Sequence, residues 1–587
     1  MKYEPLKWLN ALVRLGYDTY SNRQDIRISK GSFQGGGSST VIAGGSQVWG
    51  ESQKGSYNTG LGRGYSINGD FIISADYRYR DFTVDGFVGG SIMFNQDEGM
   101  EAFTKGGLSV PGFYSLKASI DPATVASRIY KKQTNSLYGR MALSWRSLDF
   151  VEMTLRNDWV STLPETTRSY LYPSFSGSFV VSELLSKWDW LSLWKFRGSW
   201  VTSKKAADIY AINSVLSVNS NVWGTLSSAV LPTTIRGTDI LPESTRTYEF
   251  GTVINLLKNR LSFDVAYYNK KAYDFIKSAG IIPASCYSSN FVDTEEEVTR
   301  IGVELTVNGT PVQTKDLRWD VSFNWSKYAD YYTKLDPIYS ADKPWVKVGE
   351  RADAFVYRDY LRDPQGNIIH NSSGLPEYSK YDQKYGNQGP DWIWGLNTTL
   401  KYKNWELGLS FDGRVGGNIA SVTEMYMWSS GNHPNSVTPE RYKDMTNPGS
   451  KNYIGQGVKI VSGSVEYDTY GNIVPGSDSR VFAPNDIPTT YKSYIEAFHK
   501  GTAWGGTPSR PDIYSGTFFK LREVSLTYNV PVSICSKLKA HSLSVSAIGQ
   551  NFLFWAKDFK YSDPDGGTEN YSDPSQRYLG FNIKIGF

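Results

Sequence analysis

Carboxylates beside glycines are one group of residues in this sequence that could bind a ligand such as a metal cation. Asp563 and Asp565 stand in Ser562-Asp-Pro-Asp-Gly-Gly, where their oxygens could hold a cation. The segment is shorter than a calcium-binding loop, so calcium at this turn is only a hypothesis. Asp363-Pro-Gln-Gly-Asn and Asp468-Thr-Tyr-Gly-Asn have the Asp-x-x-Gly spacing of tight turns, and we expect both at hairpin tips.

No arrangement typical of an enzyme accompanies these carboxylates. The sequence lacks the Gly-x-Ser-x-Gly of a hydrolase and a glycine-rich phosphate loop that opens a helix. No two carboxylates are singled out by spacing as a glycosidase pair, and we expect the acidic run Asp293-Thr-Glu-Glu-Glu to be solvated. We therefore predict that the chain is not an enzyme and holds no cofactor.

The histidines and cysteines are too scattered to form a metal site. The four histidines are His370, His433, His499 and His541. None of them has a metal-binding spacing to another or to a cysteine. The two cysteines, Cys286 and Cys535, fall in connections that we expect at opposite ends of the strands, so we predict no disulfide between them.

Aromatic residues in the long polar segments are candidates for contact with a substrate. Such rings can stack on sugar faces or hold peptide side chains, although packing of loop against loop would use the same residues. The candidates are Trp345, Tyr357, Tyr360, Tyr426, Trp428 and Trp504.

The composition excludes some classes of protein. The 587 residues carry a net charge of only +4, and no basic run indicates binding to nucleic acid. No apolar run reaches the roughly 18 residues of a membrane-spanning helix. The 40 tyrosines and 18 tryptophans fit the aromatic girdles of a membrane β-barrel, although a soluble glycan-binding β protein would also be rich in them.

The end of the chain has the strongest strand pattern. Leu579, Phe581, Ile583, Ile585 and Phe587 alternate with polar residues or glycine, a period of two that a strand satisfies and a helix does not. An apolar face that runs to a terminal phenylalanine is typical of the closing strand of an outer-membrane barrel. We interpret Phe587 as the C-terminal assembly signal.

Similar alternation recurs along the whole chain. We count about sixteen strands, each near the 9–11 residues or more of a tilted membrane strand, beginning with one at about 6–18. Short connections alternate with long ones, which is the arrangement of an up-and-down barrel with its long loops on one side. The short connections are expected at 80–81, 146–149, 183–189, 258–260, 309–315, 403–404 and 531–541.

The prediction is therefore all-β: one domain, 1–587, forming part of an up-and-down antiparallel transmembrane barrel. The long extracellular loops are expected at about 19–63, 95–135, 204–245, 329–390, 418–515 and 554–574. Charges on the inward face would be costly in lipid, so we expect them to line a wet lumen. They are Lys195, Arg197, Asp264, Glu304, Asp320 and Lys584. The alternatives are a passive sixteen-stranded porin and a soluble all-β carbohydrate-binding protein.

Several segments resemble the SusC/RagA-type TonB-dependent transporters of the Bacteroidetes outer membrane. The first is Arg246-Thr-Tyr-Glu-Phe-Gly with Asn259-Arg-Leu-Ser-Phe-Asp-Val-Ala-Tyr-Tyr-Asn-Lys. Others are Phe519-Lys-Leu-Arg-Glu-Val-Ser-Leu-Thr-Tyr-Asn-Val-Pro, and Gln550-Asn-Phe-Leu-Phe-Trp-Ala-Lys with Ser562-Asp-Pro-Asp and the terminal Phe587. These segments cover the second half of the chain. The first half has a similar alternating strand pattern but no specific motif of the family.

The resemblance implies a 22-stranded barrel with an N-terminal plug, of which this chain would supply about the last sixteen strands without the plug. It also implies a SusD-like surface lipoprotein over the outer loops, contact with outer-membrane lipid, and TonB-driven uptake of oligosaccharides or peptides. Met1 to Tyr20 has no signal-peptide pattern, so we expect the chain to be the C-terminal part of a longer protein. Contact with TonB would then belong to the missing N-terminal part.

Overall fold

The computed structural model describes residues 2–31, 39–41, 47–49, 54–146, 148–185, 188–237, 239–499, 510–566, 569 and 575–587. The chain divides into two compact units. The first contains residues 1–179, 199–247 and 272–295, and the second contains 180–198, 248–271 and 296–587.

Seventeen strands form one large sheet. They are β1 (Lys2–Leu6), β2 (Leu9–Ile28), β5 (Ser56–Tyr79), β6 (Phe82–Leu108), β7 (Ser119–Trp145), β8 (Asp149–Val160), β9 (Ser169–Val180), β10 (Leu191–Lys205), β14 (Glu243–Leu256), β15 (Leu261–Tyr273), β18 (Glu297–Gln313), β19 (Leu317–Lys334), β23 (Trp392–Tyr402), β24 (Trp405–Val415), β29 (Phe518–Asn529), β30 (Ser542–Ala556) and β31 (Tyr578–Gly586).

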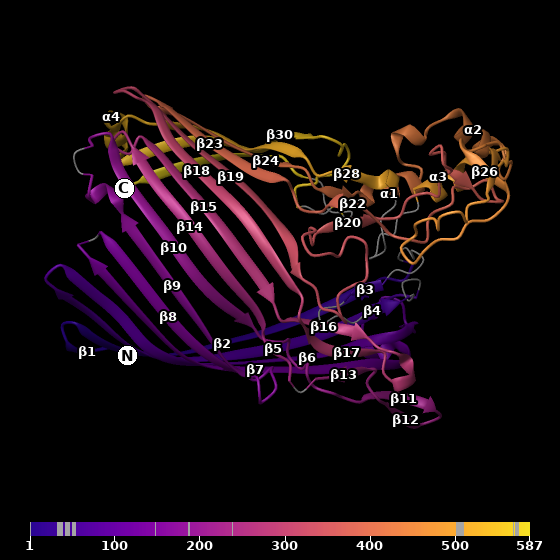
Figure 1. The fold of residues 1–587 in the computed structure, drawn as a ribbon, viewed down its shortest axis with the longest axis horizontal. Coiled ribbons are helices and arrows are strands. Elements are labelled where there is room, and N and C mark those ends of the chain that lie inside the picture. Colours follow the sequence, from indigo (N-terminus) through magenta and orange to yellow (C-terminus); the bar gives the residue numbers. More distant parts are fainter. Residues whose placement is uncertain are drawn as a thin grey trace. The chain divides into compact units, whose positions relative to one another are not determined.

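Within each unit these strands pair antiparallel in chain order. In the first unit the ladders run from β1 through β2 and β5 to β9. In the second they run from β18 through β19, β23, β24, β29 and β30 to β31. Figure 1 shows β18, β19, β23 and β24 as neighbouring long strands. The predicted up-and-down antiparallel topology is therefore confirmed for these ladders.

Smaller elements occupy the connections. The short strands are β3 (Ser39–Val41), β4 (Gln47–Trp49), β11 (Ser217–Trp223), β12 (Leu226–Val230), β13 (Thr234–Arg236), β16 (Phe275–Gly280), β17 (Ser289–Thr294), β20 (Ala354–Tyr357), β21 (Ile369–His370), β22 (Gln383–Asn387), β25 (Asn418–Ala420), β26 (Val458–Ser462), β27 (Val481–Pro484) and β28 (Ile513–Ser515). The α-helices are α1 (Val422–Ser429), α2 (Pro439–Thr446), α3 (Tyr491–Phe498) and α4 (Val532–Cys535). Single 3-10 turns lie at 116–118, 181–183, 283–285, 434–436, 510–512 and 536–538. In the described residues, no helix is both long and apolar enough to cross a membrane.

The first strand expected from the sequence is in fact a hairpin. β1 and β2 pair around a turn at 7–8, so the sheet has seventeen strands rather than about sixteen. The turns expected at 80–81, 258–260 and 403–404 are present, and Arg80, Asn259 and Lys403 adopt the positive φ of tight hairpins, at 53°, 64° and 50°.

Two of the expected long loops are much shorter. β6 and β7 pair from Phe82 opposite Trp145 out to Leu108 opposite Ser119, which leaves only 109–118 between them. β2 likewise continues to Ile28, and β5 begins at Ser56. The outer halves of these strands are polar on both faces, as in Asn95-Gln-Asp-Glu, so they carry no alternating signal of a strand. The other four expected loops correspond to the connections 206–242, 335–391, 416–517 and 557–577. A further long connection, 274–296, was not among the expected loops.

The two faces of the sheet differ in chemistry. Leu305 lies opposite Trp325, which lies opposite Trp394, in an apolar row across β18, β19 and β23. On the next positions Glu304 lies opposite Ser326 on the other face. The apolar row of β31 is open to the surroundings: Leu579, Phe581 and Ile583 are 81%, 85% and 64% exposed. An uncovered apolar face of this kind is suited to lipid.

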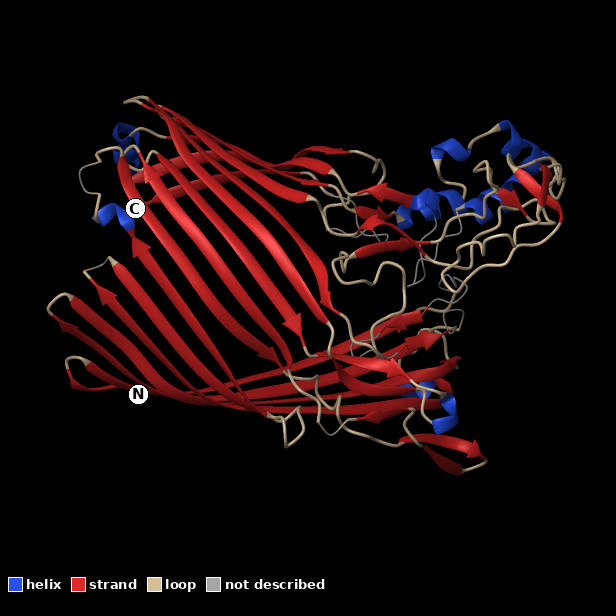
Figure 2. Cartoon of the chain, in the orientation of Figure 1, coloured by secondary structure: helices blue, strands red, loops and turns tan. Residues whose placement is uncertain are grey.

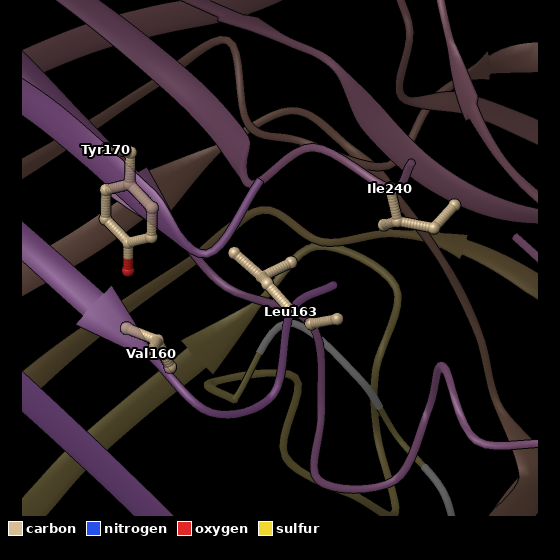
Figure 3. Packing of buried hydrophobic residues seen from close by; sticks show 5 residues of the cluster. Val160, Leu163, Tyr170 and Ile240 are labelled. Atoms are coloured by element: carbon tan, nitrogen blue, oxygen red, sulfur yellow. The ribbon is translucent and has the colours of Figure 1, made fainter. Parts of the chain in front are cut away.

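The first unit buries a small core among its connections. Val160, Leu163, Tyr170 and Ile240 converge from β8, from the connection before β9, from β9 itself and from the segment before β14 (Figure 3). Asp293 on β17 lies near this core and accepts the backbone N–H of Leu241 at 2.7 Å. Burial raises the pKa of the Asp293 carboxyl to about 6. The expectation of a solvated acidic run is therefore wrong at Asp293 and also at Glu296, which is 6% exposed.

Cys286 is an exposed free thiol and Cys535 a buried one.

Candidate functional site

The second unit carries a group of loops with helices and short ladders, which we call the loop body. It comprises residues 335–391, 416–499, 510–517 and 557–566, with Glu569. α1, α2 and α3 lie in this body and not in the sheet (Figure 2). β26 pairs parallel with β21 and antiparallel with β27. It therefore joins β21 and β27, which are more than a hundred residues apart in the sequence. The Asp363 and Asp468 motifs form the expected turns, since each carboxylate accepts backbone N–H groups two and four residues later.

Two tyrosines satisfy the C-terminal end of α3. The hydroxyls of Tyr360 and Tyr378 donate to the carbonyl oxygen of Phe498 at 2.7 and 2.6 Å. A carbonyl in the last turn of a helix has no partner inside the helix, so these bonds fix the end of α3 to the segments before and after β21. The Tyr360 ring is 5% exposed and stacks on the Phe498 ring with centroids 5.0 Å apart. Burial raises the pKa of Tyr360, which remains a neutral donor.

The indole of Trp428 on α1 lies between two imidazoles. Its centroid is 4.0 Å from that of His433 and 4.4 Å from that of His499, with interplanar angles of 11° and 8°. Two parallel rings at these distances do not fit side by side on one face, so the imidazoles cover opposite faces of the indole. Trp428 therefore offers its edge, and not a free face, to anything that enters the loop body.

Hydrogen bonds determine the tautomer of His433. Its Nδ1 accepts the backbone N–H of Asn435 at 3.1 Å, so the neutral ring carries its proton on Nε2. Nε2 lies 2.9 Å from Oε2 of Glu424 and donates to it. Both side chains are about 95% buried. Burial raises the pKa of the Glu424 carboxyl to about 7 and lowers the pKa of the His433 imidazole.

The second imidazole has a similar carboxylate partner. Nδ1 of His499 lies 2.9 Å from Oδ1 of Asp512, and both residues are buried. Burial is the main effect on Asp512 and raises the pKa of its carboxyl. The stack thus ties α1 to the end of α3 and to the 3-10 turn at 510–512 before β28.

Glu569, in the connection between β30 and β31, binds the N-terminus of α1. Ser421 accepts the N–H of Glu424 at 3.1 Å, and the Glu569 carboxylate accepts the Ser421 hydroxyl and the Thr423 N–H, each at 2.9 Å. A carboxylate at a helix N-terminus satisfies free N–H groups and opposes the positive end of the helix dipole.

These elements enclose a cavity of about 710 Å³ in the loop body, which we call the loop cavity. Its lining residues are Ile368, Glu424, Trp428, His433, Asn435, Tyr453, Gln456, Tyr494, Ile495, Phe498, His499, Pro511, Tyr514, Asp558, Lys560 and Tyr561. A concave site of this size with many aromatic rings and a few polar groups is typical of small-ligand binding.

A second cavity, of about 630 Å³, lies against the polar face of the sheet. Glu304, Asp412, Arg414 and Asp565 contribute its charged lining. Arg522 is the residue at which the register of β29 shifts against both β24 and β30, a β-bulge. Its guanidinium reaches the same side as Asp412, bonding both carboxylate oxygens at 2.7 Å.

Asp563 and Asp565 are bound to basic side chains of β29. Lys520, 1% exposed, pairs with Asp563 and lies 3.1 Å from Asp565, while Arg522 pairs with Asp565. The two carboxylates hypothesised to hold calcium are thus neutralised by an ammonium and a guanidinium, which disfavours a cation here. Across the described part of the chain, no group of three histidine, cysteine or acidic side chains could hold a metal ion.

The sequence profile of the family described as "TonB dependent receptor-like, beta-barrel" matches residues 3–435. The chain belongs to this family. TonB-dependent receptor P3 of Formosa agariphila is 22% identical over 497 residues, which cover 79% of this chain and 44% of that protein. TonB-dependent receptor SusC of Bacteroides thetaiotaomicron is 24% identical over 307 residues, which cover 47% of this chain and 30% of SusC. This barrel chain spans less than half the length of these curated relatives.

The fold has a close match among solved structures. A chain of the RagAB peptide transporter superposes with a TM-score of 0.73 at 16% identity, covering all of this chain and 61% of that one. The recognition of a SusC/RagA-type TonB-dependent receptor is therefore confirmed, as is the all-β barrel fold. Proteins of this family are β-barrels of the outer membrane, which is where this chain is located.

The six charges expected in the lumen of this TonB-dependent receptor barrel lie on the polar face of the sheet. Arg197 bonds Asp264 at 2.8 Å, and Asp320 bonds Arg318 at 2.7 Å. Glu304 lines the second cavity. Lys195 shares the face of Arg197, and Lys584 lies opposite Ser544 on β30. Pairing of opposite charges along one strand or between strands of the same face lowers the cost of keeping them on a membrane-spanning sheet. That this face lines a lumen stays a prediction.

The aromatic candidates are spread through the loop body. Trp428 lines the loop cavity, and Tyr360 packs against Phe498, which also lines it. Tyr357 is 5% exposed, with its ring edge-on to Tyr385 at 5.0 Å. Tyr426 on α1 and Trp345 are half-buried, and Trp504 lies outside the described residues. Contact of these residues with a substrate stays a prediction.

Sequence reasoning missed the histidine and carboxylate partners of Trp428. His433 and His499 are far apart in the sequence, and Glu424 and Asp512 belong to no motif. Only the packing of α1 against α3 brings these side chains together, so no spacing in the sequence could have indicated that they are partners of Trp428.

Proposed function

We propose that the protein containing this chain imports oligosaccharides or peptides across the outer membrane, and that it does no catalysis. The observation that carries the proposal is the match of residues 3–435 to the TonB-dependent receptor barrel family. The relatives that match are receptors, and one of them is SusC. The similar fold of the RagAB peptide transporter supports peptides as one of the two proposed substrate classes.

In this proposal the apolar face of the sheet meets lipid and the polar face lines the path of the substrate. The loop body meets the substrate together with a SusD-like surface lipoprotein, and energy comes from the TonB complex. Because the chain spans 44% of receptor P3, we assign the contact with TonB to a part of the protein outside these residues.

The test is uptake of labelled oligosaccharides and peptides by cells of the source organism. We expect deletion of the gene to abolish uptake of one substrate class, and the intact gene to restore it. A protonophore should stop uptake in wild-type cells, since TonB draws on the proton gradient. Uptake that survives the protonophore would support passive diffusion, and uptake unaffected by the deletion would contradict the proposal. Pull-down of the tagged protein should also recover a surface lipoprotein.

A further inference from the structure

We propose that the loop cavity binds an uncharged saccharide, which makes neutral oligosaccharides the substrate class of this transporter. The inference rests on the proposed function and narrows it. It comes from three features of the cavity: its position, the state of its charged groups, and the polar groups that remain available.

The cavity is formed where separate connections meet. Its walls come from α1, from α3, from the segment around Tyr453 and Gln456, and from residues 558–561 after β30. The Trp428 stack and the Tyr360 and Tyr378 bonds to Phe498 fix α1 and α3. A pocket held in this way is formed before a ligand arrives, which reduces the entropy lost on binding.

The carboxylates of the cavity already have partners. Glu424 accepts from His433 at 2.9 Å, and Asp558 accepts the backbone N–H of Ser515 at 2.8 Å. Lys560 lies close enough to Glu424 and His433 to affect the titration of both. A cationic ligand would face Lys560, and an anionic ligand would face Glu424 and Asp558. The cavity therefore favours a ligand without net charge.

The groups left to bind a ligand are amides, hydroxyls and ring surfaces. The side-chain amides of Asn435 and Gln456 are exposed at the cavity and make no hydrogen bond with the described residues. Tyr561 is 38% exposed, with its ring edge-on to His433 at 5.3 Å. Amides both donate and accept, as sugar hydroxyls do, and rings pack on the apolar face of a pyranose. Together these groups match a neutral sugar.

The test is isothermal titration calorimetry on the complete protein purified in detergent. The probes are neutral oligosaccharides (maltohexaose, xylohexaose, cellohexaose and mannohexaose), an oligogalacturonate and a mixture of tryptic peptides. We expect a neutral oligosaccharide to bind and N435A/Q456A to weaken it about tenfold, the loss of two hydrogen bonds. Both amides are exposed, so this variant should fold. The matched control is Q383A, which removes an exposed amide of β22 outside the cavity and should bind like wild type.

Three outcomes would overturn the inference: none of the neutral oligosaccharides binds, only oligogalacturonate or peptides bind, or neutral binding is unchanged in N435A/Q456A. The uptake assay separates this failure from that of the proposed function. Protonophore-sensitive uptake of peptides or acidic sugars would leave transport standing and refute only the saccharide site. Absence of any uptake that depends on the gene would refute the transport function itself.

Discussion

His433 donates from Nε2 to the Glu424 carboxylate at 2.9 Å while its Nδ1 accepts from the chain at Asn435. This pair is buried in the loop body, where a charged carboxylate is poorly solvated. Its energy therefore depends on whether Glu424 carries a proton.

E424Q should stabilise the loop body above pH 7 and leave it nearly unchanged at pH 4. Burial raises the pKa of Glu424 from its ordinary value to about 7. The folded state then binds the proton more tightly than the unfolded state, so this contribution is complete below about pH 4.3 and is lost as the pH rises to 7. A glutamine still accepts from His433 and never ionises. We expect the free energy of opening of α1, measured by hydrogen exchange at pH 8, to rise by about 2 to 3 kcal/mol.

The control is E496Q, which changes an exposed glutamate on α3 and should have no such effect. The lowered pKa of His433 makes stability depend on pH in the opposite direction. Wild type and E424Q share this dependence, so it largely cancels when their free energies of opening are subtracted. Equal stabilisation by E424Q at pH 4 and pH 8 would show that Glu424 does not titrate in this range.

W428A should loosen the loop body much more than truncation of another loop tryptophan. The half-buried indole loses contact with His433 and His499 on both faces, so we expect a cost approaching the about 3 to 5 kcal/mol of a fully buried aromatic ring. We expect faster hydrogen exchange across α1 and the end of α3, with unchanged exchange in β23 and β24. W345A, at a half-buried position in the connection between β19 and β23, is the matched control. Similar effects of the two variants would refute a special role for the stack.

The strand ladders could be predicted from the sequence because successive residues of a strand face opposite sides of the sheet, one apolar and one polar. Leu305 beside Glu304 and Phe581 beside Asn582 carry that signal themselves. The outer part of β6, from Asn95 to Glu98, could not be predicted because both faces are polar there. The loop body is harder still. The stacking of Trp428 between His433 and His499 depends on how α1 and α3 pack, and no periodicity or spacing in the sequence predicts that packing.

Charge introduced on the apolar face of β31 should block membrane insertion, while the same charge on its polar face should be tolerated. Phe581 is 85% exposed on the apolar face and pairs with Ala547, whereas the next residue, Asn582, pairs with Ser546 on the polar face. We expect F581R to cost about 2 to 4 kcal/mol and to reduce the amount of the complete protein in the outer membrane. N582R should leave that amount close to wild type, as measured by immunoblot of membrane fractions. Equal loss in both variants would contradict the assignment of the two faces.

K520M should release the connection between β30 and β31. Lys520 is buried and pairs with Asp563 and Asp565, so its removal leaves Asp563 without a counter-charge while Arg522 still pairs with Asp565, at a cost of about 3 to 5 kcal/mol. We expect new protease cleavage or faster hydrogen exchange in residues 557–566. K520M/D563N should recover much of the loss, because it removes the uncompensated charge. The control K403M changes a lysine in the short turn after β23. Failure of D563N to rescue would mean that Lys520 acts through packing alone.

Removal of divalent cations should leave the Asp563–Asp565 turn unchanged. Lys520 and Arg522 already bond both carboxylates, and a calcium ion would have to displace an ammonium and a guanidinium to bind there. We expect hydrogen exchange in residues 557–566 of the complete protein to be equal in EGTA and in millimolar calcium, with magnesium at the same concentration as the control for ionic strength. K520M is the informative comparison. If the turn in K520M becomes protected by calcium but not by magnesium, the ammonium is what excludes the ion from these carboxylates. Calcium-dependent protection in the wild-type protein would instead show that a cation competes successfully with Lys520.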